Sequence, residues 1–156
     1  MNNYLIETHI QELFKSALLI YIDNESQDFK ERHVGERARV FRVAYYLQNL
    51  ICHCPLLDNK SIVVDVEYNR DKDKPKLNYK KACIIPDLIV HVRNKTNNTR
   101  QYNYLACEFK NKYTDKKLEK DNEKLNNYKE RYGYKSCVCI NFNKLNKEYV
   151  ENLEFE

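Results

Sequence analysis

Two carboxylates and a lysine in the middle of the chain have the types and spacing of a site for a divalent cation. Asp87 begins one apolar, β-branched run, Glu108 and Lys110 end another, and the polar segment 94–101 separates the runs. Such runs on either side of turn residues predict a β-hairpin. If the strands pair antiparallel with Asp87 opposite Glu108, alternation of side chains places all three groups at one end of one face. Carboxylate oxygens hold Mg²⁺ or Mn²⁺, and a lysine beside them can stabilise an anion or position a water.

The same register predicts the remaining pairs of the hairpin. Ile89 should lie opposite Ala106, and His91 opposite Tyr104, on the face of the three polar groups. The other face should be apolar and consist of Leu88, Val90, Leu105 and Cys107. The pattern is short, and an ordinary solvent-facing hairpin with a Glu–Lys pair has it too. The elements around the hairpin must therefore show whether it is a cation site or an ordinary surface hairpin.

The periodicity of apolar residues predicts the elements that precede and follow the hairpin. Helical spacing predicts one helix over 3–22 and a second from residue 28 or 31 to about residue 51, with Gly35 as a weak point or a break. An alternating run predicts a strand over 61–68. An almost wholly apolar run over 136–142 predicts a strand buried on both faces.

A third helix is expected between the hairpin and the last strand. Thr114 is its predicted N-cap and Gly133 its predicted C-terminal stop, and its buried stripe should comprise Leu118, Leu125, Tyr128 and Tyr132. The elements then follow the order α-α-β-β-β-α-β. The sequence therefore predicts one α/β domain over 1–156, with a leading helix, a core from about residue 28 to 142, and a mixed central sheet of about four strands flanked by helices.

Glu36 lies on the apolar stripe of the second predicted helix. It precedes Val40 by four residues and Val43 by seven, so it is expected to point inward. A carboxylate in a first helical turn is also favoured by the helix dipole alone. The sequence leaves both interpretations open: an acidic ligand aimed at the cation, or an ordinary first-turn glutamate.

The composition is that of a mildly basic protein with reduced cysteines. Charged residues make up 32% of the 156, and the net charge is +4, which is compatible with nucleic acid as a partner. No apolar run is long enough to span a bilayer and no signal pattern opens the chain, so we expect a cytoplasmic protein without membrane contact. Cys52-His53-Cys54 is the only cluster that suggests zinc, and its spacing is not that of a usual zinc site. A homodimer is neither predicted nor excluded.

The motif and the order of elements resemble the PD-(D/E)xK nuclease superfamily, whose members have the restriction-endonuclease-like fold. The signature is carried by Pro86-Asp87 and Glu108-Phe109-Lys110. Over residues 35–142 the chain is also similar to a group of short bacterial proteins that are predicted nucleases of this superfamily with no assigned role. The resemblance implies the restriction-endonuclease-like core and metal-dependent hydrolysis of phosphodiester bonds in nucleic acid, with DNA favoured. The alternative is a module that binds nucleic acid or protein on the same fold without turnover.

The resemblance also implies roles for individual residues. Asp87, Glu108 and Glu36 would bind Mg²⁺ or Mn²⁺, with the backbone carbonyl of Phe109 as a further ligand. Lys110 would assist the attacking water or stabilise the transition state. The segment 67–70 would lie beside this site.

Further residues are candidates for supporting roles. Glu67 could serve a second metal, and Arg70 could bind a phosphate or pair on the surface with a neighbouring aspartate. His91 is a candidate general base, although a hydrogen-bonded structural histidine is the favoured interpretation. The loop 71–81 is predicted to be the main nucleic-acid contact, or else a solvated connection in a lysine-rich chain. Its lysines are Lys72, Lys74, Lys76, Lys80 and Lys81.

Overall fold

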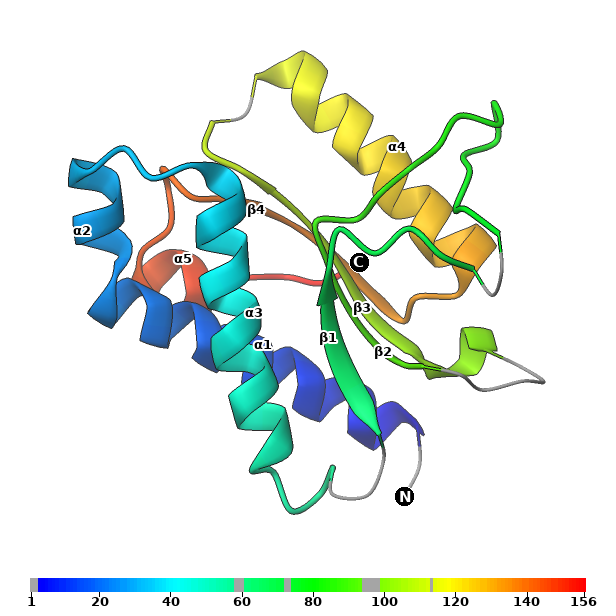
Figure 1. Cartoon of the computed structure of the whole chain (residues 1–156), viewed down its shortest axis with the longest axis horizontal. Coiled ribbons are helices and arrows are strands. Elements are labelled where there is room, and N and C mark those ends of the chain that lie inside the picture. The colour runs from blue at the N-terminus through cyan, green and yellow to red at the C-terminus, as the bar shows by residue number, and fades with distance from the viewer. Residues whose placement is uncertain (1–2, 58–60, 72–73, 94–98, 113) are drawn as a thin grey trace.

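A four-stranded mixed β-sheet forms the centre of the protein, with helices on both of its faces (Figure 1). The computed structural model describes residues 3–57, 61–71, 74–93, 99–112 and 114–156. The strands lie side by side in chain order: β1 (Ile62–Val66), β2 (Leu88–Val92), β3 (Asn103–Lys110) and β4 (Ser136–Asn141). The first three strands are antiparallel, and β3 and β4 are parallel. The predicted α/β class and the mixed four-stranded sheet are therefore confirmed.

The central hairpin has the predicted register near the polar groups and departs from it further along. Ile89 lies opposite Ala106, as expected, and Leu88 lies opposite Cys107. The register then shifts between Val90 and His91, so that His91 lies opposite Asn103 and not opposite Tyr104. The prediction for His91 was wrong because a β-bulge inserts one extra residue into a strand, which simple alternation cannot anticipate.

Long helices pack on opposite faces of the sheet (Figure 1). The helices α1 (Asn3–Asn24) and α3 (Glu36–Cys52) share one apolar core with the β2 and β3 residues Leu88, Val90, Leu105 and Cys107. On the other face, α4 (Asp115–Tyr132) packs Leu125, Tyr128 and Tyr132 against Ile89 and Ala106. The 3₁₀ turn η1 (Thr99–Tyr102) precedes β3, and the short helix α5 (Lys147–Glu151) follows β4. In the part of the chain that the structure describes, no helix is long and apolar enough to cross a bilayer.

Both faces of the hairpin are buried, which differs from the prediction of one apolar and one polar face. All five residues of β2 are buried, because α4 covers the face on which Asp87, Glu108 and Lys110 were expected. Leu118 was predicted to join the buried stripe of α4, but it is 40% exposed. The stripe begins further along the helix, since the first turn extends beyond the end of the sheet (Figure 1). Asp87, Glu108 and Lys110 lie at one end of the hairpin, and the buried His91 lies towards its other end.

The second predicted helix is two helices, α2 (Ser26–Glu31) and α3, separated by a break that ends at Gly35. Gly35 is extended, with φ −62° and ψ 154°, and forms the N-cap of α3. Arg39 secures the break, because its buried guanidinium donates to the carbonyl oxygens of Val34 and Phe29 at 3.0 and 3.1 Å. This arrangement makes Glu36 the first residue of α3 and fixes where its side chain starts.

Candidate active site

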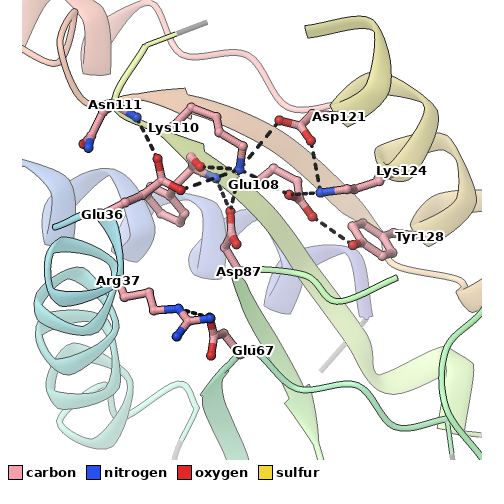
Figure 2. A network of polar contacts seen from close by, with 11 residues as sticks. Glu36, Arg37, Glu67, Asp87, Glu108, Lys110, Asn111, Asp121, Lys124 and Tyr128 are labelled. Carbon is pink, nitrogen blue, oxygen red and sulfur yellow. Dashed lines mark hydrogen bonds and ion pairs between the residues drawn. The ribbon is translucent and has the colours of Figure 1, made fainter. Parts of the chain in front are cut away.

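The ammonium group of Lys110 lies among four carboxylates at the end of β3 (Figure 2). Its Nζ donates to the carbonyl oxygen of Phe109 at 2.7 Å. The nearest carboxylate oxygens belong to Asp87 at 3.4 Å, Glu36 at 3.7 Å, Asp121 at 3.8 Å and Glu108 at 3.9 Å. The structure thus brings together the four residues that the sequence singled out, namely Glu36, Asp87, Glu108 and Lys110. Their roles in catalysis and metal binding stay predictions.

Backbone hydrogen bonds hold two of these carboxylates against the end of β3. Asp87 directly precedes β2, and its Oδ2 accepts a hydrogen bond from the backbone N–H of Phe109 at 2.7 Å. The first residue of α3, Glu36, accepts one from the backbone N–H of Asn111 at 2.8 Å. These bonds orient the carboxylates without neutralising them, because an amide donor carries no net charge. Three segments far apart in the sequence therefore meet at one strand end.

The carboxylate of Glu108 is fully buried and is held by α4. Its Oε2 accepts from the ammonium of Lys124 at 2.7 Å, and its Oε1 accepts from the hydroxyl of Tyr128 at 2.8 Å. Burial and the charge of Asp87 raise the pKa of Glu108 to about 7, against the opposing effect of Lys124. The carboxylate is therefore poised between its two protonation states near neutral pH.

Two charged residues of α4 complete the cluster, and the sequence interpretation did not assign them. Asp121 is buried, and its Oδ1 lies 3.0 Å from the Nζ of Lys124. Burial alone would lower the pKa of Lys124, but Glu108 and Asp121 outweigh it and raise the pKa. A signal was present, because residues 121, 124 and 128 lie on one helix face. On a helix as rich in charge as this one, the same spacing is also typical of a solvated surface, so it did not stand out.

The cluster has the donor chemistry and the charge for a hard divalent cation, although Lys110 now lies at its centre. Four carboxylates face only two ammonium groups, and the side-chain oxygens Asp121 Oδ2 and Asn111 Oδ1 are buried without a hydrogen-bond partner in the described structure. Such oxygens are the ligands that Mg²⁺ and Mn²⁺ prefer. Among the described residues, no three His, Cys, Asp or Glu side chains are already arranged to hold a metal together. A cation in the cluster would therefore displace the Lys110 ammonium from between the carboxylates.

The three accessory candidates occupy different surroundings. Glu67 forms an ion pair with Arg37 at 2.7 Å, beside Asp87 (Figure 2). Arg70 has an exposed side chain, and its backbone carbonyl accepts from Lys76. His91 is buried, and its Nε2 lies 2.8 Å from Asp65 Oδ2, so its contact is with Asp65 and not with the cluster around Lys110.

Asp65 of β1 binds both the buried His91 of β2 and the more exposed Arg93, which directly follows β2. The Nε of Arg93 donates to Asp65 at 2.9 Å, and a second bond joins the same two side chains. Burial alone would raise the pKa of Asp65, but these hydrogen bonds outweigh it and lower the pKa to about 2. Asp65 and His91 are thus paired with each other inside the protein, and the structural role favoured for His91 stays a prediction.

The structure corrects one of the lysines predicted to contact nucleic acid. Lys76 is only 2% exposed, and its Nζ donates to the carbonyl oxygens of Tyr68 and Arg70 at 3.2 and 2.5 Å. The loop folds over this side chain, so Lys76 cannot reach a phosphate. Lys74, Lys80 and Lys81 are exposed and stay candidates, with Lys80 lying 3.7 Å from Glu123. Lys72 lies outside the described residues.

Replacing Lys76 with alanine should lower the free energy of unfolding by about 2–4 kcal/mol, because two carbonyl oxygens lose their donor and a void opens over the Tyr68 ring. Urea unfolding monitored by circular dichroism measures the change. Lys81→Ala, at an exposed position of the same loop, is the matched control and should change stability by less than about 0.5 kcal/mol. Equal effects of the two substitutions would contradict the structural role of Lys76.

Comparisons with known proteins do not extend these observations. No protein-family model matches the chain, and neither the curated proteins nor the solved structures contain a significant match.

Proposed function

We propose that this protein is a metal-dependent nuclease of the PD-(D/E)xK type, with a restriction-endonuclease-like core, that hydrolyses phosphodiester bonds of nucleic acid, DNA being the favoured substrate. The observation that carries the proposal is the convergence of Glu36, Asp87 and Glu108 on Lys110 from three separate segments. On a solvated surface, carboxylates from separate segments repel one another and would not be expected to gather at one point. Keeping a fully buried glutamate beside other carboxylates is costly for folding, and such costs are typical of functional sites.

The charge of the cluster supports a metal-dependent reaction in particular. With four carboxylates against two ammonium groups, the cluster by itself repels a phosphodiester. A divalent cation reverses this sign and supplies both a more acidic water and a partner for the phosphate oxygens. Asp87, Glu36, Glu108 and the Phe109 carbonyl are the residues that would hold it. Asp121 offers a further buried oxygen next to them.

The chain's own residues then have separable tasks. Lys124 donates to Glu108 at 2.7 Å, whereas the shortest contact of Lys110 with a carboxylate is 3.4 Å, to Asp87. The Lys110 ammonium can therefore turn to the attacking water or to the charged phosphorane-like transition state. Lys124 and Tyr128 each hold one oxygen of Glu108 and so fix its orientation. Asp87 and Glu36 are fixed by backbone N–H groups, which leaves their other oxygens for the cation.

A direct test is the incubation of the full chain with Mg²⁺ or Mn²⁺ and labelled single- and double-stranded DNA and RNA, beside Asp87→Asn. The parent should cleave at least one of these substrates, and the variant should cleave it at least a hundredfold more slowly, because it lacks one ligand charge. Calorimetric titration with Mn²⁺ should show a matching loss of affinity. The alternative, a binding module on the same fold, predicts that the parent binds nucleic acid or protein without cleaving any strand. Equal cleavage by parent and variant would remove Asp87 from the reaction.

A further inference from the structure

A cavity of about 320 Å³ lies beside the Lys110 cluster, between the start of α3 and the end of β1. Glu36 and Asp87 belong to its wall and also contact the Lys110 ammonium. Whatever occupies the cavity therefore lies directly next to the carboxylates of the cluster. Its volume is at the lower end of the range for small-molecule sites in proteins, so the occupant is a small group.

Four other lining residues are apolar, and two of them are unusually exposed. Phe41 is 57% exposed and Val66 is 37% exposed, although both are large apolar side chains next to a charged centre. Val40 and Ala38 complete this apolar surface. An aromatic ring that stays accessible beside a polar site offers a flat face on which another ring can stack.

One edge of the cavity is polar, and a backbone turn positions one of its two residues. The Nε of Arg37 lies 2.7 Å from Glu67 Oε1, and both side chains remain accessible to solvent, at 87% and 47% (Figure 2). Glu67 has a φ of 50°, a left-handed conformation that is uncommon for a residue other than glycine, and its N–H donates to the backbone carbonyl of Asp87 at 3.2 Å. This turn ends β1 and places the Glu67 side chain opposite Arg37. The pair combines donors and acceptors at the rim of an apolar hollow.

We propose that this cavity is a subsite for one unpaired nucleobase of the substrate, stacked on Phe41, while the adjoining phosphate lies at the Lys110 cluster. The inference rests on the proposed function and names its substrate class. A nucleobase is flat, has apolar faces and polar edges, and is linked through its sugar to a phosphate. These features match the ring of Phe41, the Arg37–Glu67 edge and the shared wall of Glu36 and Asp87.

A base inside a duplex cannot enter such a cavity, because its faces are covered by its neighbours and its edge is paired. Entry requires a single strand, or a base that has left the stack. The substrate is therefore single-stranded or locally unpaired nucleic acid, and an intact duplex binds more weakly.

The test compares strands that differ only in their bases. Fluorescence anisotropy in Ca²⁺ follows binding of the full chain to labelled oligothymidine, to a fully abasic strand of equal length, and to the corresponding duplex, with gels confirming that the strands stay intact. The parent should bind oligothymidine about tenfold more tightly than the abasic strand or the duplex. The Phe41→Ala variant should bind oligothymidine about tenfold more weakly than the parent does, and should bind the abasic strand with unchanged affinity. Circular dichroism melting checks that the variant is folded, which the exposure of Phe41 leads us to expect.

Tyr45 provides a matched control, because it is an aromatic residue of the same helix, one turn further on and 50% exposed, outside the cavity lining. Tyr45→Ala should bind all three probes as the parent does. If the parent cleaves nucleic acid, three results would overturn the subsite alone. Phe41→Ala could bind oligothymidine as tightly as the parent does, or bind oligothymidine and the abasic strand more weakly by the same factor. The third result is a duplex that binds the parent as tightly as the single strand does. A parent that neither binds nor cleaves any strand would overturn the proposed function and this inference together.

Discussion

Replacing Lys110 with alanine should slow phosphodiester hydrolysis by about 10²–10³-fold and at the same time tighten the binding of Mn²⁺. The slower reaction follows because an ammonium group acts on charge that develops only in the transition state. The tighter binding follows because that ammonium now lies between the oxygens of Asp87, Glu36 and Glu108, where it competes with a metal cation for them. Single-turnover kinetics and calorimetric titration measure the two effects separately.

The same substitution should destabilise the protein in the absence of metal, since the Lys110 side chain is only 22% exposed and four carboxylates lose a shared counter-ion. Added Mn²⁺ should restore the lost stability, because it binds the folded state only. Lys112→Ala, at an exposed position two residues further on, is the control and should leave rate, affinity and stability unchanged. A Lys110→Ala protein that cleaves as fast as the parent would exclude Lys110 from the mechanism.

Glu108→Gln should abolish most of the activity and yet make the protein more stable at pH 8, by about 1–3 kcal/mol. Burial, followed by the charge of Asp87, raises the pKa of Glu108 from 4.5 to about 7. Between these values the folded state holds a proton that the unfolded state has lost, so stability falls as the pH rises from 4.5 to 7, and the full penalty remains above pH 7. Each unit of pKa shift corresponds to about 1.4 kcal/mol, and glutamine removes the charge that causes the penalty.

Glu108→Gln removes one charged partner of Lys124, but this loss does not cancel the gain in stability, because the Lys124 ammonium keeps Asp121 as a partner at 3.0 Å. Urea unfolding at pH 8 and at pH 4.5 should show a difference between variant and parent that is large at the higher pH and small at the lower. Glu123→Gln, on the exposed side of α4, should change stability by less than about 0.5 kcal/mol at either pH. A variant less stable than the parent at pH 8 would show that the charge on Glu108 contributes more through Lys124 than its burial costs.

The sequence by itself determined the features that depend on local periodicity. Alternation of side chains predicted the pairing of Ile89 with Ala106 and the gathering of Asp87, Glu108 and Lys110 at one end of the hairpin, because a strand has a fixed period of two. Helical spacing placed Glu36 on the inner face of its helix for the same kind of reason. Gly133 ends α4 in the left-handed conformation, with φ 69°, as expected of a residue without a side chain.

Only the tertiary structure decided which charged residues are buried and what they contact. The sequence around Lys76 is that of a solvated loop, yet Lys76 is buried and its ammonium donates to the carbonyl oxygens of Tyr68 and Arg70. Asp121 and Lys124 join the cluster because α4 packs across the sheet beside β3, and no local pattern specifies that contact. Long charged side chains are directed by partners that are distant in sequence, and a bulge or a helix break depends on packing energies of a few kcal/mol. The residue pattern of each segment therefore specifies the helices and strands, while the charge balance around Lys110 arises only when those helices and strands pack together.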